Sequence, residues 1–303
     1  MTILCGTDFS DASREALRAA IAWARREGTG VELVHVVDLH GASALLSHGE
    51  GALVPVEKEL ARWRARAEER LAAESAACAG SGVSVTARVL EGAADEAIVA
   101  HAARSNASLV VVASVGARAG SPFTLGSTAD RVAQSSDRAV LVVRDAAPIE
   151  AWCAKRADLR ALACVEEGAS SDAAVAWSAA LARTGGVQLS ALHVYWPPER
   201  AAKHAGVPLP IGREHAGAER ELAQSLEARI ALHAGGTRIP LELVGGLGRA
   251  ADHVALAADE RKAGLVVVGS HQRAGLARFW HGSVSHGVID RVRSNVVVVP
   301  ARA

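Results

Sequence analysis

Two glycine-rich segments hold the residue types best suited to binding a charged ligand. Residues 109–128 read LVVVASVGARAGSPFTLGST, and residues 265–284 read LVVVGSHQRAGLARFWHGSV. In each segment a four-residue apolar run leads into a loop, and a Gly-Ser pair then opens a predicted helix. Backbone N–H groups at a helix start, a hydroxyl group and the positive end of the helix together attract phosphate. The two segments are therefore candidate phosphate-binding loops.

The same glycines also have a purely structural explanation, which the sequence alone leaves open. Gly116 and Gly269 stand early in their loops, where a missing side chain lets the backbone approach a bulky anion. Gly126 and Gly282 could instead be selected for the backbone shape of a helix-capping turn. Four arginines could neutralise phosphate or could simply be solvated surface residues: Arg118, Arg131, Arg273 and Arg278.

The repeated segment indicates that the whole chain is a duplication. Gly126 and Gly282 stand 156 positions apart, which is about half of the 303 residues. A chain of this length suits about two domains of ~100–200 residues each. We predict a first domain at 1–145, a linker at 146–158 that contains Ala-Ala-Pro, and a second domain at 159–303.

Both halves alternate predicted strands and helices in the same order. In the first half we predict strands at 2–7, 31–37, 83–90, 109–113 and 139–143, and helices at 11–28, 56–79, 93–104 and 127–135. In the second half the predicted strands are 159–165, 187–194, 239–244, 265–269 and 296–299, and the helices are 172–183, 214–233, 250–262 and 284–293. Segments 38–54 and 196–210 are predicted loops.

The strand composition predicts an α/β fold with two tandem, doubly wound, five-stranded parallel sheets. Runs such as VVVV lack polar alternation, as expected for strands that crossover helices bury on both faces. Ligands of such sheets bind beyond the carboxyl ends of the strands, at the point where the strand order reverses. The loops after the first and fourth strands should lie there, and these loops carry Asp8 and the glycine-rich segment.

This arrangement resembles the universal stress protein family over essentially the whole chain. The family pattern G-x2-G-x9-G-[S/T] follows a fourth strand, an acidic residue ends the first strand, as Asp8 does in ILCGTDFSDAS, and His-Val closes the second, as in LVHV at 33–36 and LHV at 192–194. The resemblance implies a Rossmann-like fold of the adenine nucleotide alpha hydrolase kind. It also implies adenine-nucleotide binding in some members and none in others, and pairing of domains through the last strand.

The resemblance assigns family positions to particular residues of the first half. It implies an adenine-nucleotide site formed by Asp8 at the ribose, the backbone of Val36 or Val37 at the adenine, and Gly116, Gly126, Ser127 and Thr128 at the phosphates. The first glycine of the pattern is replaced by Ala113, a mild change if that backbone keeps a negative φ.

The second half matches the family pattern less well. Gly269, Gly282 and Ser283 match, but Gln272 replaces the middle glycine and puts a side chain where backbone should meet phosphate. A gap-free alignment from His193 places Glu166 opposite Asp8. We therefore expect the first half to be the better nucleotide site.

Composition argues against several other classes of protein. With 33 basic and 33 acidic residues the chain has no basic excess for nucleic acid or an anionic membrane, and no apolar run reaches the ~18–20 residues that span a bilayer. The N-terminus reads at once as a strand, so we expect a cytoplasmic protein. Cys5 and Cys164 fall in apolar strands and read as buried residues, and the histidines show no metal-type spacing on a helix.

Two short motifs have simpler explanations than the chemistry they suggest. Residues 246–251, GLGRAA, fit a dinucleotide fingerprint, but they follow a third strand and lack the later acid. Residues 283–287, SVSHG, partly match a nucleophile elbow but lie at a helix start, without its first glycine.

Two hypotheses about function remain. In the first, the chain is a regulatory stress-response protein that binds ATP, with Mg²⁺ accompanying it, chiefly through the first half; any ATPase activity would be weak because no general base is evident. In the second, it is a stress-response scaffold that acts through protein partners or another small ligand. In either case we predict that strands 139–143 and 296–299 pair edge to edge to join the halves as a pseudo-dimer. A homodimer of such chains is left open.

Overall fold

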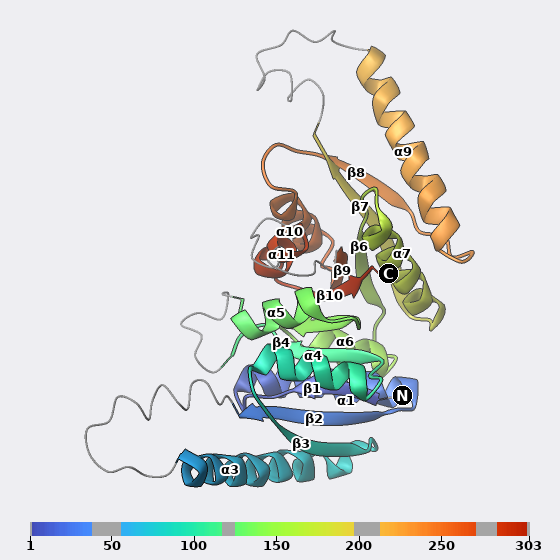
Figure 1. Ribbon diagram of the computed structural model, residues 1–303. Coiled ribbons are helices and arrows are strands. Elements are labelled where there is room, and N and C mark those ends of the chain that lie inside the picture. Colours follow the sequence, from blue (N-terminus) through green and yellow to red (C-terminus); the bar gives the residue numbers. More distant parts are fainter. Residues whose placement is uncertain (1, 38–55, 117–124, 197–212, 271–283, 302–303) are drawn as a thin grey trace. The chain divides into compact units, whose positions relative to one another are not determined.

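The computed structural model describes residues 2–37, 56–116, 125–196, 213–270 and 284–301 (Figure 1). The chain divides into two compact units, Met1–Ala154 and Lys155–Ala303. This division lies inside the segment 146–158 that we predicted as a linker. The predicted loops at 38–54 and 197–210, and the site residues Gly282 and Ser283, lie outside the described residues.

Unit 1 is built on a parallel sheet with strand order β3-β2-β1-β4-β5. Its strands are β1 (Thr2–Gly6), β2 (Gly30–Val37), β3 (Val85–Glu91), β4 (Leu109–Ala113) and β5 (Val140–Val143). Its helices are α1 (Asp11–Glu27), α3 (Val56–Ala77), α4 (Ala94–Arg104), α5 (Ser127–Ser135) and α6 (Ala147–Cys153), with a short 3₁₀ turn, η1 (Ala79–Ser81).

The strand order fixes where the helices of unit 1 lie. The chain moves outward from β1 through β2 to β3 and then returns to β4 and β5. Because parallel crossovers are right-handed, this reversal puts α1 and α3 on one face of the sheet and α4 and α5 on the other. Both faces of the central strands are therefore buried, and Ile3, Leu4, Val110 and Val111 are inaccessible to solvent.

Helix α1 shows how local sequence sets the bounds of an element that positions the site. Its N-cap Ser10 accepts a hydrogen bond from the Ser13 N–H, and Gly28 ends the helix in a left-handed conformation with φ of 66°. Between these caps, buried residues such as Ala16, Ala20 and Ala24 recur every four positions and face the sheet. The first turn of α1 is therefore fixed directly above the end of β1.

Unit 2 repeats this plan with strand order β10-β9-β6-β7-β8, again all parallel. Its strands are β6 (Leu159–Cys164), β7 (Val187–Tyr195), β8 (Leu241–Gly245), β9 (Leu265–Ser270) and β10 (Asn295–Pro300). Its helices are α7 (Ala169–Arg183), α9 (Arg213–His233), α10 (Ala250–Glu260) and α11 (Val284–Arg291). The predicted α/β class with two tandem, doubly wound domains is thus confirmed.

The segment predicted as a linker contains the helix α6, which packs on unit 1. Trp152 of α6 is 2% exposed and meets Trp23 edge-on, with ring centroids 5.2 Å apart. The Arg26 guanidinium lies 4.2 Å from the centre of the Trp152 ring, and Arg18 forms a two-pronged ion pair with Glu150 at 3.0 and 2.5 Å. Helix α6 therefore packs on α1 and forms part of unit 1.

Candidate functional site

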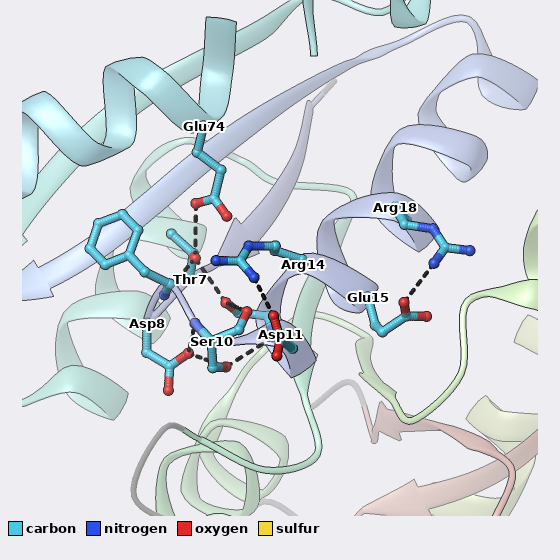
Figure 2. Close-up of polar contacts among 10 residues, drawn as sticks. Thr7, Asp8, Ser10, Asp11, Arg14, Glu15, Arg18 and Glu74 are labelled. Carbon is cyan, nitrogen blue, oxygen red and sulfur yellow. Dashed lines mark hydrogen bonds and ion pairs between the residues drawn. The ribbon is translucent and has the colours of Figure 1, made fainter. Parts of the chain in front are cut away.

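The loop between β1 and α1 holds Asp8 in a defined position. Asp8 Oδ1 accepts hydrogen bonds from the Ser10 N–H at 3.1 Å and the Ser10 hydroxyl at 2.6 Å, as Figure 2 shows. Ser10 Oγ in turn accepts from the Ser13 N–H at 3.1 Å. One carboxylate oxygen of Asp8 is thus tied to the helix cap.

A second set of hydrogen bonds supports this loop from the α3 side. The Thr7 hydroxyl donates to Glu74 Oε2 at 3.1 Å and accepts from the Phe9 N–H at 3.0 Å. The Ser13 hydroxyl lies 3.0 Å from Thr7 Oγ1 and donates to the Ser10 carbonyl at 2.9 Å. In Figure 2 Glu74 points from α3 toward Thr7, so α3, α1 and the loop after β1 meet next to Asp8.

His35 on β2 completes the support. Its Nδ1 lies 2.8 Å from the Thr7 carbonyl, and because a carbonyl can only accept, Nδ1 carries the proton. Burial above all, and then the charge of Arg70, hold the pKa of His35 below its usual range, although the Thr7 carbonyl, Asp8 and Glu74 oppose this shift. His35 is therefore a donor that fixes the end of β1.

The glycine-rich loop of unit 1 closes against Asp8. The Gly126 N–H donates to the Ser114 carbonyl at 2.7 Å, which brings the two ends of the loop together. A Cβ atom at Gly116 would lie 3.0 Å from Asp8 Oδ2. The structure thus brings together Asp8, Gly116 and Gly126, which the sequence placed in two separate loops.

Gly126 is not required by the fold of the described residues. Its φ is −69° and its ψ is 137°, which any residue adopts. A Cβ atom built there would meet nothing closer than 3.5 Å among the described residues, which is ordinary van der Waals contact. The backbone shape of a capping turn therefore does not explain this glycine.

Helix α5 begins immediately beyond Gly126. Ser127 and Thr128 are its first two residues, and Gly126, as the N-cap, offers no side chain to their N–H groups. Arg131, one of the four arginines considered for phosphate, lies 3.7 Å from Asp95 and is 65% exposed. Arg118, Arg273 and Arg278 lie outside the described residues.

Of the two valines predicted to contact adenine, Val36 has the better backbone orientation. The Val34 carbonyl accepts from the Thr7 N–H and the Val37 carbonyl accepts from the Gly92 N–H, at 2.8 and 3.1 Å. Backbone groups alternate sides along a strand, so those of Val36 point as Val34 does, into the space beyond the end of β1. The Val37 carbonyl points the other way, toward β3.

Unit 2 has the same histidine contact at the end of its first strand as unit 1, but the loop that follows is different. His193 Nδ1 lies 2.7 Å from the Val165 carbonyl, as His35 does from Thr7, which supports the alignment of Glu166 with Asp8. Glu166 is exposed, and its N–H donates to the Ser171 hydroxyl at 2.9 Å. The N-cap of α7 is Gly168, whose φ of 141° favours glycine.

Gly269 of unit 2 has a packing explanation that Gly126 lacks. A Cβ atom at position 269 would overlap the carbonyl group of Ser170, because the first turn of α7 lies directly on the end of β9. Glycine is therefore needed at 269 for the helix to pack. Gln272, Gly282 and Ser283 lie outside the described residues.

No cysteine in the chain has the character of an activated thiol. Burial, followed by the charges of Glu74 and Cys78, raises the pKa of Cys5, and burial raises the pKa of Cys153 and of Cys164 to about 12. Across the described ranges no group of three or more His, Cys, Asp or Glu side chains could hold a metal ion. In the same part of the chain no helix is long and apolar enough to cross a membrane.

Sequence reasoning found the residues of the loops and missed those that support them. Thr7 and Glu74 are 67 positions apart, and no short motif links them. The Phe9 ring lies between the His35 ring, with centroids 4.5 Å apart, and the Arg70 guanidinium, 4.1 Å from its centre. The signal available was a phenylalanine directly after the acidic residue, in a chain with three phenylalanines.

Fold and loops together define a doubly wound α/β protein with polar loops at the carboxyl ends of its strands, and this plan occurs twice in one chain. The model of the universal stress protein family matches residues 1–144 and 159–300. The chain therefore belongs to this family, with two family domains in tandem.

Two relatives show how far the similarity extends. Universal stress protein MJ0531 of Methanocaldococcus jannaschii is 31% identical over 143 residues, which are 47% of this chain and 81% of that protein. The crystal structure of a universal stress protein from Archaeoglobus fulgidus superposes with a TM-score of 0.71, covering 99% of this chain and 98% of that one at 17% identity. At that identity the likeness shows the fold.

Proposed function

We propose that the chain is a regulatory stress-response protein that binds an adenine nucleotide, ATP foremost, through unit 1. The observation that carries this proposal is Gly126. Neither its backbone angles nor the described atoms around it call for glycine, whereas close approach of a bulky anion to the N-terminus of α5 does.

The neighbouring groups fit the chemistry of a nucleotide. Asp8 can accept hydrogen bonds from ribose hydroxyls, because an ionised carboxylate has several acceptor sites on its two oxygens. The backbone of Val36 offers a donor and an acceptor to the edge of adenine. Gly116, Gly126 and the N–H groups of Ser127 and Thr128 suit the phosphates, whose charge Mg²⁺ would help to neutralise.

We assign unit 2 a lesser part in binding. Gly269, Gly282 and Ser283 remain proposed positions there, but packing of α7 already accounts for Gly269. Glu166, opposite Asp8, is exposed and its loop has a different backbone. One nucleotide per chain is the expected stoichiometry.

The test is calorimetric titration of the full chain with ATP and Mg²⁺. Gly126→Val should abolish binding, because the valine side chain occupies the space over the N–H groups of α5, while the urea midpoint stays near that of the parent. Gly217→Ala is the matched control: the position lies in α9 with open space around it, so the alanine should leave the affinity unchanged and add up to about 1 kcal/mol of stability.

Absence of binding by the parent at millimolar ATP would overturn this proposal. Equal ATP affinities of the parent and the Gly126→Val variant would show that the nucleotide site lies elsewhere in the chain. Any ATPase activity in the same samples should be weak, because no general base is assigned.

The alternative is a scaffold that acts through protein partners or another small ligand. Two departures from the family loop favour it, Ala113 in unit 1 and Gln272 in unit 2. Ala113 ends β4 in extended conformation, so the first departure costs the backbone nothing. Mass spectrometry of the purified protein separates the two functions, since a stoichiometric bound nucleotide excludes an empty scaffold.

We further propose that the two units form an intrachain pseudo-dimer through β5 and β10, the last strand of each sheet. Each of these strands ends the strand order of its own unit on one side. An unpaired edge made of valines is an aggregation hazard, which pairing removes. A homodimer of whole chains and a cytoplasmic location are further proposals, which sedimentation and cell fractionation would test.

A further inference from the structure

Phe9 has a backbone conformation that its residue type disfavours. Its φ is 65°, in the left-handed region, where a Cβ atom crowds the following carbonyl. Such a conformation persists only where the surroundings enforce it, and it often marks a functional position. Phe9 directly follows Asp8, so its backbone angles set the direction of the Asp8 loop.

The surroundings of Phe9 do enforce it. Its ring packs between the His35 ring on β2 and the Arg70 guanidinium on α3, at 4.5 and 4.1 Å. Its N–H is held by Thr7 Oγ1 at 3.0 Å, and Thr7 is held by Glu74. The ring is thus anchored to β2 and α3, and the backbone is anchored to α3 through Thr7.

Unit 2 keeps the histidine of this clamp, as His193, but lacks the phenylalanine and the threonine. The alignment through His35 and His193 puts Val165 in place of Thr7, Glu167 in place of Phe9 and Gly168 in place of Ser10. Within unit 2 it is Gly168 that takes a positive φ, one residue later. The two loops therefore follow different paths, and Glu166 is not held as Asp8 is.

We propose that Phe9 is a positioning residue: clamped between His35 and Arg70, it holds the Asp8 loop in a left-handed turn that aims Asp8 Oδ2 at Gly116 and so makes unit 1 the ligand-binding unit. This inference rests on the proposed function, because its ligand is the adenine nucleotide. A loop ordered before binding does not lose that conformational entropy on binding, so the clamp raises affinity.

The experiment compares ATP affinity, thermal stability and amide hydrogen exchange in the full chain and three variants. Phe9→Ala removes the ring but keeps the backbone strain of the positive φ. Phe9→Gly removes both the ring and the strain, and Phe9→Tyr keeps both. We expect the first two to bind ATP at least about tenfold more weakly and Phe9→Tyr to stay within about threefold of the parent. Asn106→Gly, which relieves a left-handed residue with φ of 52° in the turn before β4, should not change affinity.

Hydrogen exchange tests the clamp independently of nucleotide. The N–H groups of Phe9 and Ser10, bonded to Thr7 Oγ1 and Asp8 Oδ1, should exchange at least about tenfold faster in Phe9→Gly and at the parental rate in Phe9→Tyr. Equal exchange in all variants, or a parent that binds ATP no better than Phe9→Gly, would overturn the inference. A parent that binds no ATP would overturn the proposed function and leave the clamp to be judged by exchange alone.

Discussion

Two loops with the same sequence pattern can contain glycine for different structural reasons. Gly126 sits in backbone that any residue adopts, with room for a Cβ atom among the described residues, whereas Gly269 lies under the Ser170 carbonyl. Both look alike as letters of one loop pattern. The structure therefore separates a glycine that the described fold does not require from one that allows a helix to pack.

The sequence could predict that Asp8, Gly116 and Gly126 lie in loops beyond strand ends, because each stands at a fixed offset from a strand. It could not predict the contact of Glu74 with Thr7 or of Arg70 with Phe9, since these pairs form only when α3 packs on the sheet. The supporting residues of a site are tertiary contacts, and their spacing in the chain follows loop lengths rather than chemistry.

His35 should make the stability of unit 1 depend on pH. Burial lowers its pKa, so the unfolded chain takes up a proton before the folded one as the pH falls below the ordinary value of about 6.5. This contribution to stability is present above that value and is lost as the pH falls toward the folded pKa. The free energy of unfolding in urea should therefore fall less between about pH 7.5 and about pH 5.5 in His35→Gln, which cannot titrate, than in the parent.

Arg70→Met provides the control for that measurement. The Arg70 charge is a cause of the lowered pKa of His35, so its removal should make the pH dependence shallower than in the parent. If the free energy of unfolding changes equally between the two pH values in the parent and in His35→Gln, then His35 does not contribute to the pH dependence of stability.

At the scale of elements, the bounds of helices follow caps where the sequence provides them. Ser10 and Gly28 mark the ends of α1, and the prediction from sequence was correct there. Helix α7 begins at Ala169, three residues before the predicted start, because its N-cap is Gly168 and no side-chain cap marks it. Helix α6 was read as linker, although Pro148 in its first turn was a usable signal.

The packing of α6 predicts a large difference between two neighbouring substitutions. Trp152→Ala should cost about 3–5 kcal/mol, because it leaves a cavity between α6 and α1 where Trp23 and Arg26 now pack. Glu150→Ala should cost no more than about 1 kcal/mol, because its partner Arg18 is half exposed and the pair is screened by water. Urea unfolding of both variants measures this, and a small effect of Trp152→Ala would mean that α6 is only a tether.

At the scale of the molecule, the duplication could be predicted almost completely. Strand order, parallel direction and helix placement in each unit follow from alternating apolar runs and the right-handed crossover rule. The sequence does not determine whether the terminal strand of each sheet pairs with a further strand. β5 and β10 are valine-rich terminal strands, and a free edge of this kind would expose unsatisfied backbone groups.

Backbone direction shows which amides report on those edges. The carbonyls of Ala139 and Val143 accept from β4, so the N–H groups of Val140 and Val142 point away from it. The Ala301 N–H donates to the carbonyl of Ser270, the last residue of β9, so the N–H groups of Val296 and Val298 point away from β9 by the same alternation. These four amides are bonded only if something pairs with the edge.

Pairing of β5 with β10 therefore predicts slow hydrogen exchange for the amides of Val140, Val142, Val296 and Val298 in the full chain. The internal reference is β3, the other terminal strand of unit 1. The Val31 N–H donates to Ser84, so the amides of Ala87 and Val89 point away from β2 and should exchange fast. A difference of at least about a hundredfold between the two sets is expected for bonded and open amides. If the four valine amides exchange as fast as Ala87 and Val89, the edges are open and the two units are joined only by the chain between them.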